Sequence, residues 1–288
     1  MTEPTNPPME LRARMPAPLK DVMHALTDPA SMRRWLAEHA EVDLPHRYEF
    51  WGRYTPEGDA PHQTLRHADD RNLRFSWLLD GEQTDVDIAL SEDGDETILD
   101  LSQSHWSFDY VTQGTSIRGV LQTFWVLAIA NLADHLAGRA LNPKIDFSTP
   151  EMRAEVVIDA PRDVVYDSLV DAAKFSEWFG YPVEMEPYTG GRFAMGGFDN
   201  NPHPAKFLEV VPQVRATLEF PGTAVATWEL ADAGGKTRLT FVQSGFDTAN
   251  PPYAAWGGWL SGVAELRRYH EVAQWRPLWL DPEPANAG

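Results

Sequence analysis

Hydrophobic positions along the chain follow two different periods. Between residues 72 and 103, apolar side chains fall at every second position, which predicts β-strands with one buried face. The clearest run is Leu73, Phe75, Trp77 and Leu79. Farther along, the apolar steps lengthen to three and four residues, which predicts an amphipathic helix. The positions in that helix are Leu121, Trp125, Ile129, Leu132 and Leu136.

The second half of the chain repeats this order of periods. Its last alternating run is Leu239, Phe241 and Gln243, and its helical run is Trp256, Trp259, Val263, Leu266 and Tyr269. Each half therefore predicts a strand, two short helices, a series of antiparallel strands and one long helix. A curved sheet packed around that helix is the compact way to bury both apolar faces.

The two halves also match residue by residue. Residues 17–35 align without a gap to residues 160–178, and further matches reach the long helices. The matched pairs include Pro18 and Pro161, Asp28 and Asp171, Trp35 and Trp178, Leu90 and Leu230, Thr97 and Thr237, Gln103 and Gln243, and Trp125 and Trp259. We therefore predict an α+β protein made of two tandem helix-grip domains, at residues 9–140 and 152–275, with flexible ends at 1–8 and 281–288.

The repeated stretch contains its own helix signals. Pro18 and Pro161 suit the first turn of a helix, because the N–H that proline lacks has no helical partner there. Asp28 and Asp171 are placed to cap the helix that follows, by accepting hydrogen bonds from its free amide groups.

Composition narrows the possible functions. The 288 residues include no cysteine, which excludes disulfides, thiolate nucleophiles and cysteine-bound zinc. The net charge of −19 disfavours nucleic acid and anionic membrane as partners. The most apolar run, residues 124–132, is too short to span a bilayer, and residues 2–8 lack a signal-peptide pattern. We expect a soluble, cytoplasmic protein.

Several of these motifs together resemble a known family. They are the Ala-Pro start, the aspartate before a tryptophan, the bend Gly190-Gly191-Arg192-Phe193, the Gly-x-x-Thr-x-Leu strand and the last helix with its tryptophan and leucine. The chain is similar to the START-like, or SRPBCC, superfamily, and within it to the branch named after the activator of the heat-shock chaperone ATPase. The first copy departs from this pattern at His46, Arg47 and Tyr48, where the bend lacks its glycines.

The sequence contains no strong catalytic signature. The glycines near residue 190 lie between expected strands, so they do not fit a phosphate-binding loop, and the serines lack a nucleophile-elbow sequence. The nine histidines form no ligand cluster. We therefore expect no metal and no cofactor, and whether the protein is an enzyme stays open.

The resemblance implies a hydrophobic pocket between the concave face of the sheet and the long helix. Its expected lining in the first copy is Phe75, Trp77, Gln103 and Trp125, and in the second copy Phe193, Phe241, Gln243 and Trp259. Aromatic residues at such positions more often only fill a core. The two glutamines are better candidates for ligand contact, because an inward amide needs a hydrogen-bond partner.

Three classes of function fit these observations. The first is the binding of a small hydrophobic molecule, aromatic or polyketide-like, for transport or sequestration. The second is a cyclase- or aromatase-like enzyme that uses polar groups of the pocket as acid and base. The third, a chaperone cofactor with a chaperone partner, is implied by the family name alone.

Overall fold

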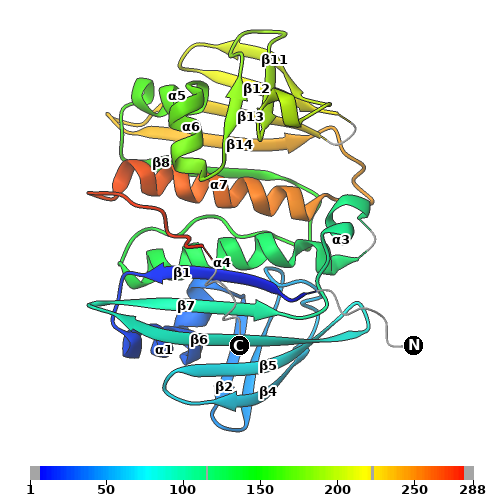
Figure 1. Cartoon of the computed structure of the whole chain (residues 1–288), viewed down its shortest axis with the longest axis vertical. Helices are drawn as coiled ribbons and strands as arrows, with labels where there is room; N and C mark the ends of the chain where they lie inside the picture. The colour runs from blue at the N-terminus through cyan, green and yellow to red at the C-terminus, as the bar shows by residue number, and fades with distance from the viewer. Residues whose placement is uncertain (1–6, 115, 222–223, 282–288) are drawn as a thin grey trace. The chain divides into compact units, whose positions relative to one another are not determined.

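The computed structural model describes residues 7–114, 116–221 and 224–281, and its contacts group the chain into two compact units (Figure 1). Unit 1 contains Met1–Thr149, Tyr253–Gly258 and the chain from Leu278 onward. Unit 2 contains Pro150–Pro252 and Trp259–Pro277. Unit 1 thus includes two short segments from late in the sequence, which the pattern of the repeat did not assign to the first copy. The expected flexible ends fall largely outside the described residues.

Unit 1 contains a five-stranded antiparallel sheet in the order β1-β7-β6-β5-β4. Its strands are β1 (Met9–Met15), β4 (Gln63–Ala68), β5 (Asn72–Leu79), β6 (Glu82–Asp93) and β7 (Glu96–Gln103). A separate hairpin is formed by β2 (His39–Asp43) and β3 (Arg47–Trp51). The helices are α1 (Leu19–Thr27), α2 (Pro29–Trp35), α3 (Phe108–Gln113), the 3-10 turn η1 (Ile117–Val120) and α4 (Leu121–Leu136).

Unit 2 contains a seven-stranded antiparallel sheet in the order β8-β14-β13-β12-β11-β10-β9. Its strands are β8 (Arg153–Ile158), β9 (Val183–Met185), β10 (Arg192–Met195), β11 (Ala205–Val211), β12 (Arg215–Phe220), β13 (Ala224–Asp232) and β14 (Thr237–Ser244). Its helical elements are α5 (Arg162–Val170), α6 (Ala172–Phe179), the 3-10 turn η2 (Phe198–Asn200) and α7 (Tyr253–Glu271), whose first residues belong to unit 1. The predicted α+β class, with antiparallel sheets and a long helix late in each copy, is confirmed.

The duplication extends to individual hydrogen bonds. The Thr97 hydroxyl donates to the Ala17 carbonyl at 2.8 Å, and the Thr237 hydroxyl donates to the Ala160 carbonyl at the same distance. The indole N–H of Trp35 donates to the Ala25 carbonyl at 3.0 Å, and that of Trp178 donates to the matching Ser168 carbonyl at 2.8 Å. The threonine bonds tie the segment that follows the first strand of each copy to the last strand, and the indole bonds fix the tryptophan at the end of the second short helix.

Replacing Thr97 or Thr237 with valine should lower the free energy of unfolding by about 1–2 kcal/mol, because each change leaves a buried carbonyl without its donor. Both threonines are fully buried, so the two variants should lose similar amounts. Denaturant unfolding measures the loss, and hydrogen exchange localises it to unit 1 for Thr97→Val and to unit 2 for Thr237→Val. A loss confined to one of the two variants would contradict the equivalence of the two bonds.

The residues predicted to begin and cap the helices of the repeat do so nearly as expected. Asp28 accepts a hydrogen bond from the Ser31 amide at 2.7 Å, and Asp171 accepts from the Ala173 amide at 2.9 Å, so both cap the second helix. The hydrogen bond from the Ser31 amide lowers the pKa of the Asp28 carboxyl below its ordinary value. The prolines differ slightly from the prediction, because Pro18 and Pro161 occupy the N-cap position rather than the first turn.

The copies differ at the bend where their sequences differ. In unit 2, the Gly190 amide donates to the Phe207 carbonyl at 2.7 Å, and the Phe207 amide donates to the Gly191 carbonyl at 2.9 Å. These bonds join the bend to β11, so β9 and β10 continue the main sheet. In unit 1, the Phe50 amide donates instead to the side chain of Gln63 at 3.2 Å, and β2 and β3 remain a separate hairpin.

A short segment from late in the chain extends the unit 1 sheet. Ala13 and Trp279 form an antiparallel bridge. The Arg14 amide donates to the Leu278 carbonyl, and the Leu280 amide donates to the Arg12 carbonyl, both at 2.9 Å. Residues 278–280 therefore cover part of the edge of β1 through one β-bridge and two backbone hydrogen bonds. Among the described residues, none of the helices has the length and hydrophobicity needed to cross a membrane.

Candidate functional site

The four candidate residues of the first copy meet inside unit 1. Phe75 and Trp77 come from β5, Gln103 comes from β7 and Trp125 comes from α4, and all four are fully buried. The rings of Trp77 and Trp125 lie 6.2 Å apart in an edge-to-face arrangement. Alternation along β5 and helical spacing along α4 thus turn these side chains toward one another.

Protein groups occupy both ends of the Gln103 amide. The Trp125 indole N–H donates to Oε1 of Gln103 at 2.7 Å, and Nε2 of Gln103 donates to the Thr84 hydroxyl at 2.9 Å. The Thr84 hydroxyl in turn donates to the Trp77 carbonyl at 2.9 Å. This chain of bonds satisfies the inward amide within the protein.

Three further aromatic residues, which the sequence did not single out, complete this core. Tyr48 and Phe50 from β3 lie 5.1 and 5.9 Å from the Phe75 ring, and Phe124 from α4 lies 5.7 Å from Trp77. Burial raises the pKa of the Tyr48 hydroxyl. The Trp77 indole Nε1 is buried without a hydrogen-bond partner among the described residues. Unit 1 therefore has a dense aromatic core whose glutamine is already bonded.

The four candidates of the second copy contribute to the core of unit 2. Phe193 lies on β10, Phe241 and Gln243 lie on β14, and Trp259 lies on α7. The Trp259 ring is 5.1 Å from Trp228 and 5.5 Å from both Phe220 and Phe241. Phe193 lies farther along the sheet, 6.2 Å from Phe220. Trp259 is only partly buried, unlike its counterpart Trp125.

Gln243 differs from Gln103 in its hydrogen bonds. It is 4% exposed, and its buried Oε1 has no hydrogen-bond partner among the described residues. Trp259 therefore does not make the bond that Trp125 makes in unit 1. The position of Thr84 is taken by Ala224, because Leu90 matches Leu230 and Thr84 lies six residues before it. Alanine offers no hydroxyl to the Nε2 end of the amide, and because Trp259 does not donate to the other end, the buried Oε1 is left unpaired.

A pocket of about 310 Å³ opens beside this glutamine. It lies where β14 ends and β8 begins, and its surface is mostly apolar. The lining residues are Pro150, Glu151, Met152, Arg153, Val242, Gln243, Ser244, Gly245, Phe246 and Thr248. Of the four residues expected for the second copy, this lining includes Gln243. The ligand contacts expected for Phe193, Phe241 and Trp259 stay a prediction, as do those of the first copy.

A larger depression of about 490 Å³ lies on the face of the unit 1 sheet opposite its core, and its lining is more charged than that of the pocket beside Gln243. Its lining includes the ion pairs Arg12–Asp100 and Arg74–Asp87. Such a charged surface suits an apolar ligand poorly. The smaller pocket beside Gln243 is therefore the better candidate site.

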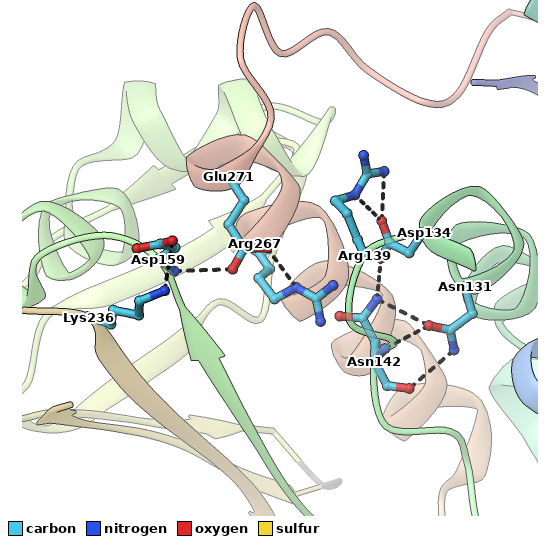
Figure 2. Close-up of polar contacts among 8 residues, drawn as sticks. All are labelled: Asn131, Asp134, Arg139, Asn142, Asp159, Lys236, Arg267 and Glu271. Carbon is cyan, nitrogen blue, oxygen red and sulfur yellow. Dashed lines mark hydrogen bonds and ion pairs between the residues drawn. The ribbon is translucent and has the colours of Figure 1, made fainter. Parts of the chain in front are cut away.

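Two polar clusters hold the ends of the long helices (Figure 2). In unit 1, Asn142 donates from its side chain to Asn131 and Asp134 at 3.2 and 2.9 Å, and Arg139 donates to Asp134 at 2.8 Å. In unit 2, Glu271 accepts from the Asp159 amide at 3.1 Å, and Lys236 donates to the Asp159 carboxylate at 2.8 Å. In the described part of the chain, no group of three acidic or histidine side chains could hold a metal ion.

Comparison with known proteins places this geometry in a family. The helix-grip arrangement of sheet and helix defines the START-like class, and the model of one of its families matches the chain twice. That family is described as activator of Hsp90 ATPase homolog 1-like protein, and it matches residues 16–137 and 159–271. The chain belongs to this family, with two copies of its domain in tandem. A search of curated proteins found no match.

Several solved structures are similar to the chain at low sequence identity. DynU16, described as a protein in the dynemicin biosynthetic locus, is 15% identical, with 92% of this chain and 100% of that one covered and a TM-score of 0.39. CalU16 from Micromonospora echinospora is 28% identical over 46% of this chain and 76% of its own, with a TM-score of 0.36. The Aha1 dimer from Colwellia psychrerythraea is 14% identical over 42% of this chain and 96% of its own, with a TM-score of 0.36.

Proposed function

We propose that unit 2 binds a small, largely apolar molecule in the pocket beside Gln243, as a carrier or by sequestering it. One observation carries the proposal: Gln243 Oε1 is buried without a partner beside a mostly apolar pocket, whereas the matching Gln103 is bonded at both ends. An unpaired buried acceptor is costly, and a ligand that donates a hydrogen bond to it would recover that cost.

The neighbouring side chains suit such a molecule. Met152 is buried, Val242 and Phe246 are partly buried, and together they give the pocket apolar walls. Mostly apolar walls with a few polar groups are the usual composition of a small-molecule site, in which the walls contribute affinity and the polar groups set orientation. The ligand would therefore have an apolar body and at least one hydrogen-bond donor.

Replacing Gln243 with leucine should weaken the binding of an apolar fluorescent probe, N-phenyl-1-naphthylamine, by about fivefold, the value of one hydrogen bond of about 1 kcal/mol. The substitution keeps the volume and removes the acceptor. The probe is uncharged, so the net charge of −19 does not repel it. Titration of the full chain, followed by the rise in probe fluorescence, gives the affinity.

Two variants serve as controls for this measurement. Gln103→Leu should leave the affinity unchanged but lower stability, because it strips Trp125 and Thr84 of their partner. Ala224→Thr should leave the affinity nearly unchanged, because the added hydroxyl matches that of Thr84, which accepts from the Nε2 end of the amide and leaves Oε1 free. Equal losses of affinity in Gln103→Leu and Gln243→Leu would contradict a site confined to unit 2.

A further inference from the structure

The edge of β8 presents unpaired backbone groups. Within the described part of unit 2, this strand is bonded to β14 on one side only. The Gln243 amide donates to the Met152 carbonyl at 3.0 Å, so even-numbered residues of the strand bond toward β14. The N–H and C=O groups of Arg153, Glu155 and Val157 therefore point to the open side.

The matching edge in unit 1 is occupied. There the Arg14 N–H and the Arg12 C=O are bonded to residues 278–280. The repeat places Val157 at the position of Arg14 and Glu155 at the position of Arg12. Among the described residues, the Val157 N–H and the Glu155 C=O have no such partner. The two copies thus present the same strand edge, which is covered in unit 1 and open in unit 2.

Exposure of the side chains agrees with this difference. Arg153, Glu155 and Val157 are all exposed, and Val157 is 47% accessible. In unit 1, the side chains of Arg12 and Arg14 at the covered edge are only 17% and 22% exposed. An open edge of this kind can accept an extended peptide as a further strand.

We propose that the open edge of β8 binds an extended segment of another protein as an added antiparallel strand. The side chains on β8 define the chemistry of that segment. From its N-terminal end, it would place an apolar residue opposite Val157, a basic residue opposite Glu155 and an acidic residue opposite Arg153. Opposite charges across a strand pair are favourable and like charges are not. The proposal does not depend on the proposed ligand site.

A second copy of this chain fits the edge less well. In the longest symmetric pairing of two β8 strands, Glu155 would lie opposite Glu155, and directly opposed like charges are destabilising. Each chain also carries a net charge of −19, which opposes the close approach of two copies. A partner with a lysine or arginine opposite Glu155 avoids the first penalty and reduces the second.

Two synthetic peptides test the proposal on the full chain. Both consist of threonine with one valine, one lysine and one glutamate. The matched peptide places them opposite Val157, Glu155 and Arg153, and the exchanged peptide swaps lysine and glutamate. Fluorescence anisotropy of the labelled peptides should show saturable binding of the matched peptide and about fivefold weaker binding of the exchanged one. Equal binding of the two, or binding of neither, would overturn the proposal.

Val157→Pro isolates the backbone contribution, because it removes an N–H that faces the open side and spares the ladder with β14. It should abolish binding of the matched peptide, while Val157→Thr, which keeps both the N–H and the branched shape, should preserve it. Wild-type affinity in Val157→Pro would contradict strand addition at this edge. Loss of a concentration-dependent dimer in the same variant, measured by sedimentation, would assign the edge to a second copy instead.

A charge swap keeps the test decisive if the proline variant fails to fold. The double variant Arg153→Glu with Glu155→Arg alters only exposed side chains, although it also breaks the ion pair between Glu155 and Arg238 at 3.4 Å. It should reverse the preference between the two peptides. An unchanged preference would show that the peptides bind elsewhere and would overturn the proposal.

Discussion

Replacing Trp125 with alanine should lower the free energy of unfolding of unit 1 by about 3–5 kcal/mol, as expected for a large buried aromatic ring. Trp125 is 1% exposed, its ring packs against Phe124 at 5.1 Å, and its indole bonds the Gln103 amide. The substitution therefore opens a cavity and also leaves a buried acceptor unpaired. Denaturant unfolding with hydrogen exchange resolved by segment measures the effect in this unit.

Trp259→Ala is the matched control in unit 2. It should cost less, because Trp259 is partly exposed and makes no bond to Gln243. The same substitution should change probe affinity if Trp259 contacts the ligand. If both variants lost the same stability, the difference in packing between the two copies would have no energetic consequence.

Gly191→Ala should destabilise unit 2 by about 3 kcal/mol, at the upper end of the usual cost of overpacking. A Cβ atom at this position would lie 2.0 Å from the Glu186 carbonyl oxygen, which is part of the backbone and cannot move aside like a flexible side chain. Relief of the clash would break the bonds that join the bend to β11. Thermal unfolding and hydrogen exchange in β9 and β10 would report the loss.

The neighbouring glycine offers a control with a different cause. Gly190 has a φ of 90°, which non-glycine residues rarely adopt, but a Cβ there would meet no atom within 4 Å. Gly190→Ala should therefore cost about 1–2 kcal/mol from backbone strain alone. A greater loss for Gly190→Ala than for Gly191→Ala would show that backbone conformation, not the close approach to Glu186, restricts this bend.

The features of the fold that repeat were predictable from the sequence. The alternation at Leu73 to Leu79 and the helical spacing around Trp125 are local signals, and all of these side chains are buried as predicted except Leu136, which is partly buried. The two caps at Asp28 and Asp171 depend on residues only two or three positions away. Such short-range relations can be predicted from a sequence because each depends only on residues that are close together in the chain.

The relations that differ between the copies were not predictable in the same way. Gln103 and Gln243 occupy equivalent positions, yet their bonding depends on whether the helix tryptophan reaches Oε1 and on whether Thr84 or Ala224 lies on the neighbouring strand. The aligned repeat already pairs Thr84 with Ala224, but only the register of the strands places that position beside the glutamine. The bridge from Ala13 to Trp279 carried no comparable signal, because three residues are too few for a periodic pattern and their partner is distant in the chain.

The bridged segment at residues 278–280 has a consequence for the order in which the protein is made. Unit 1 begins with the earliest residues of the chain, but the edge of β1 is covered only by residues that the ribosome adds after all of unit 2. During translation, the Arg14 N–H and the Arg12 C=O therefore lack these hydrogen-bond partners while unit 2 is synthesised. Domains usually fold in the order of synthesis. Here the first unit to appear is the last to be completed.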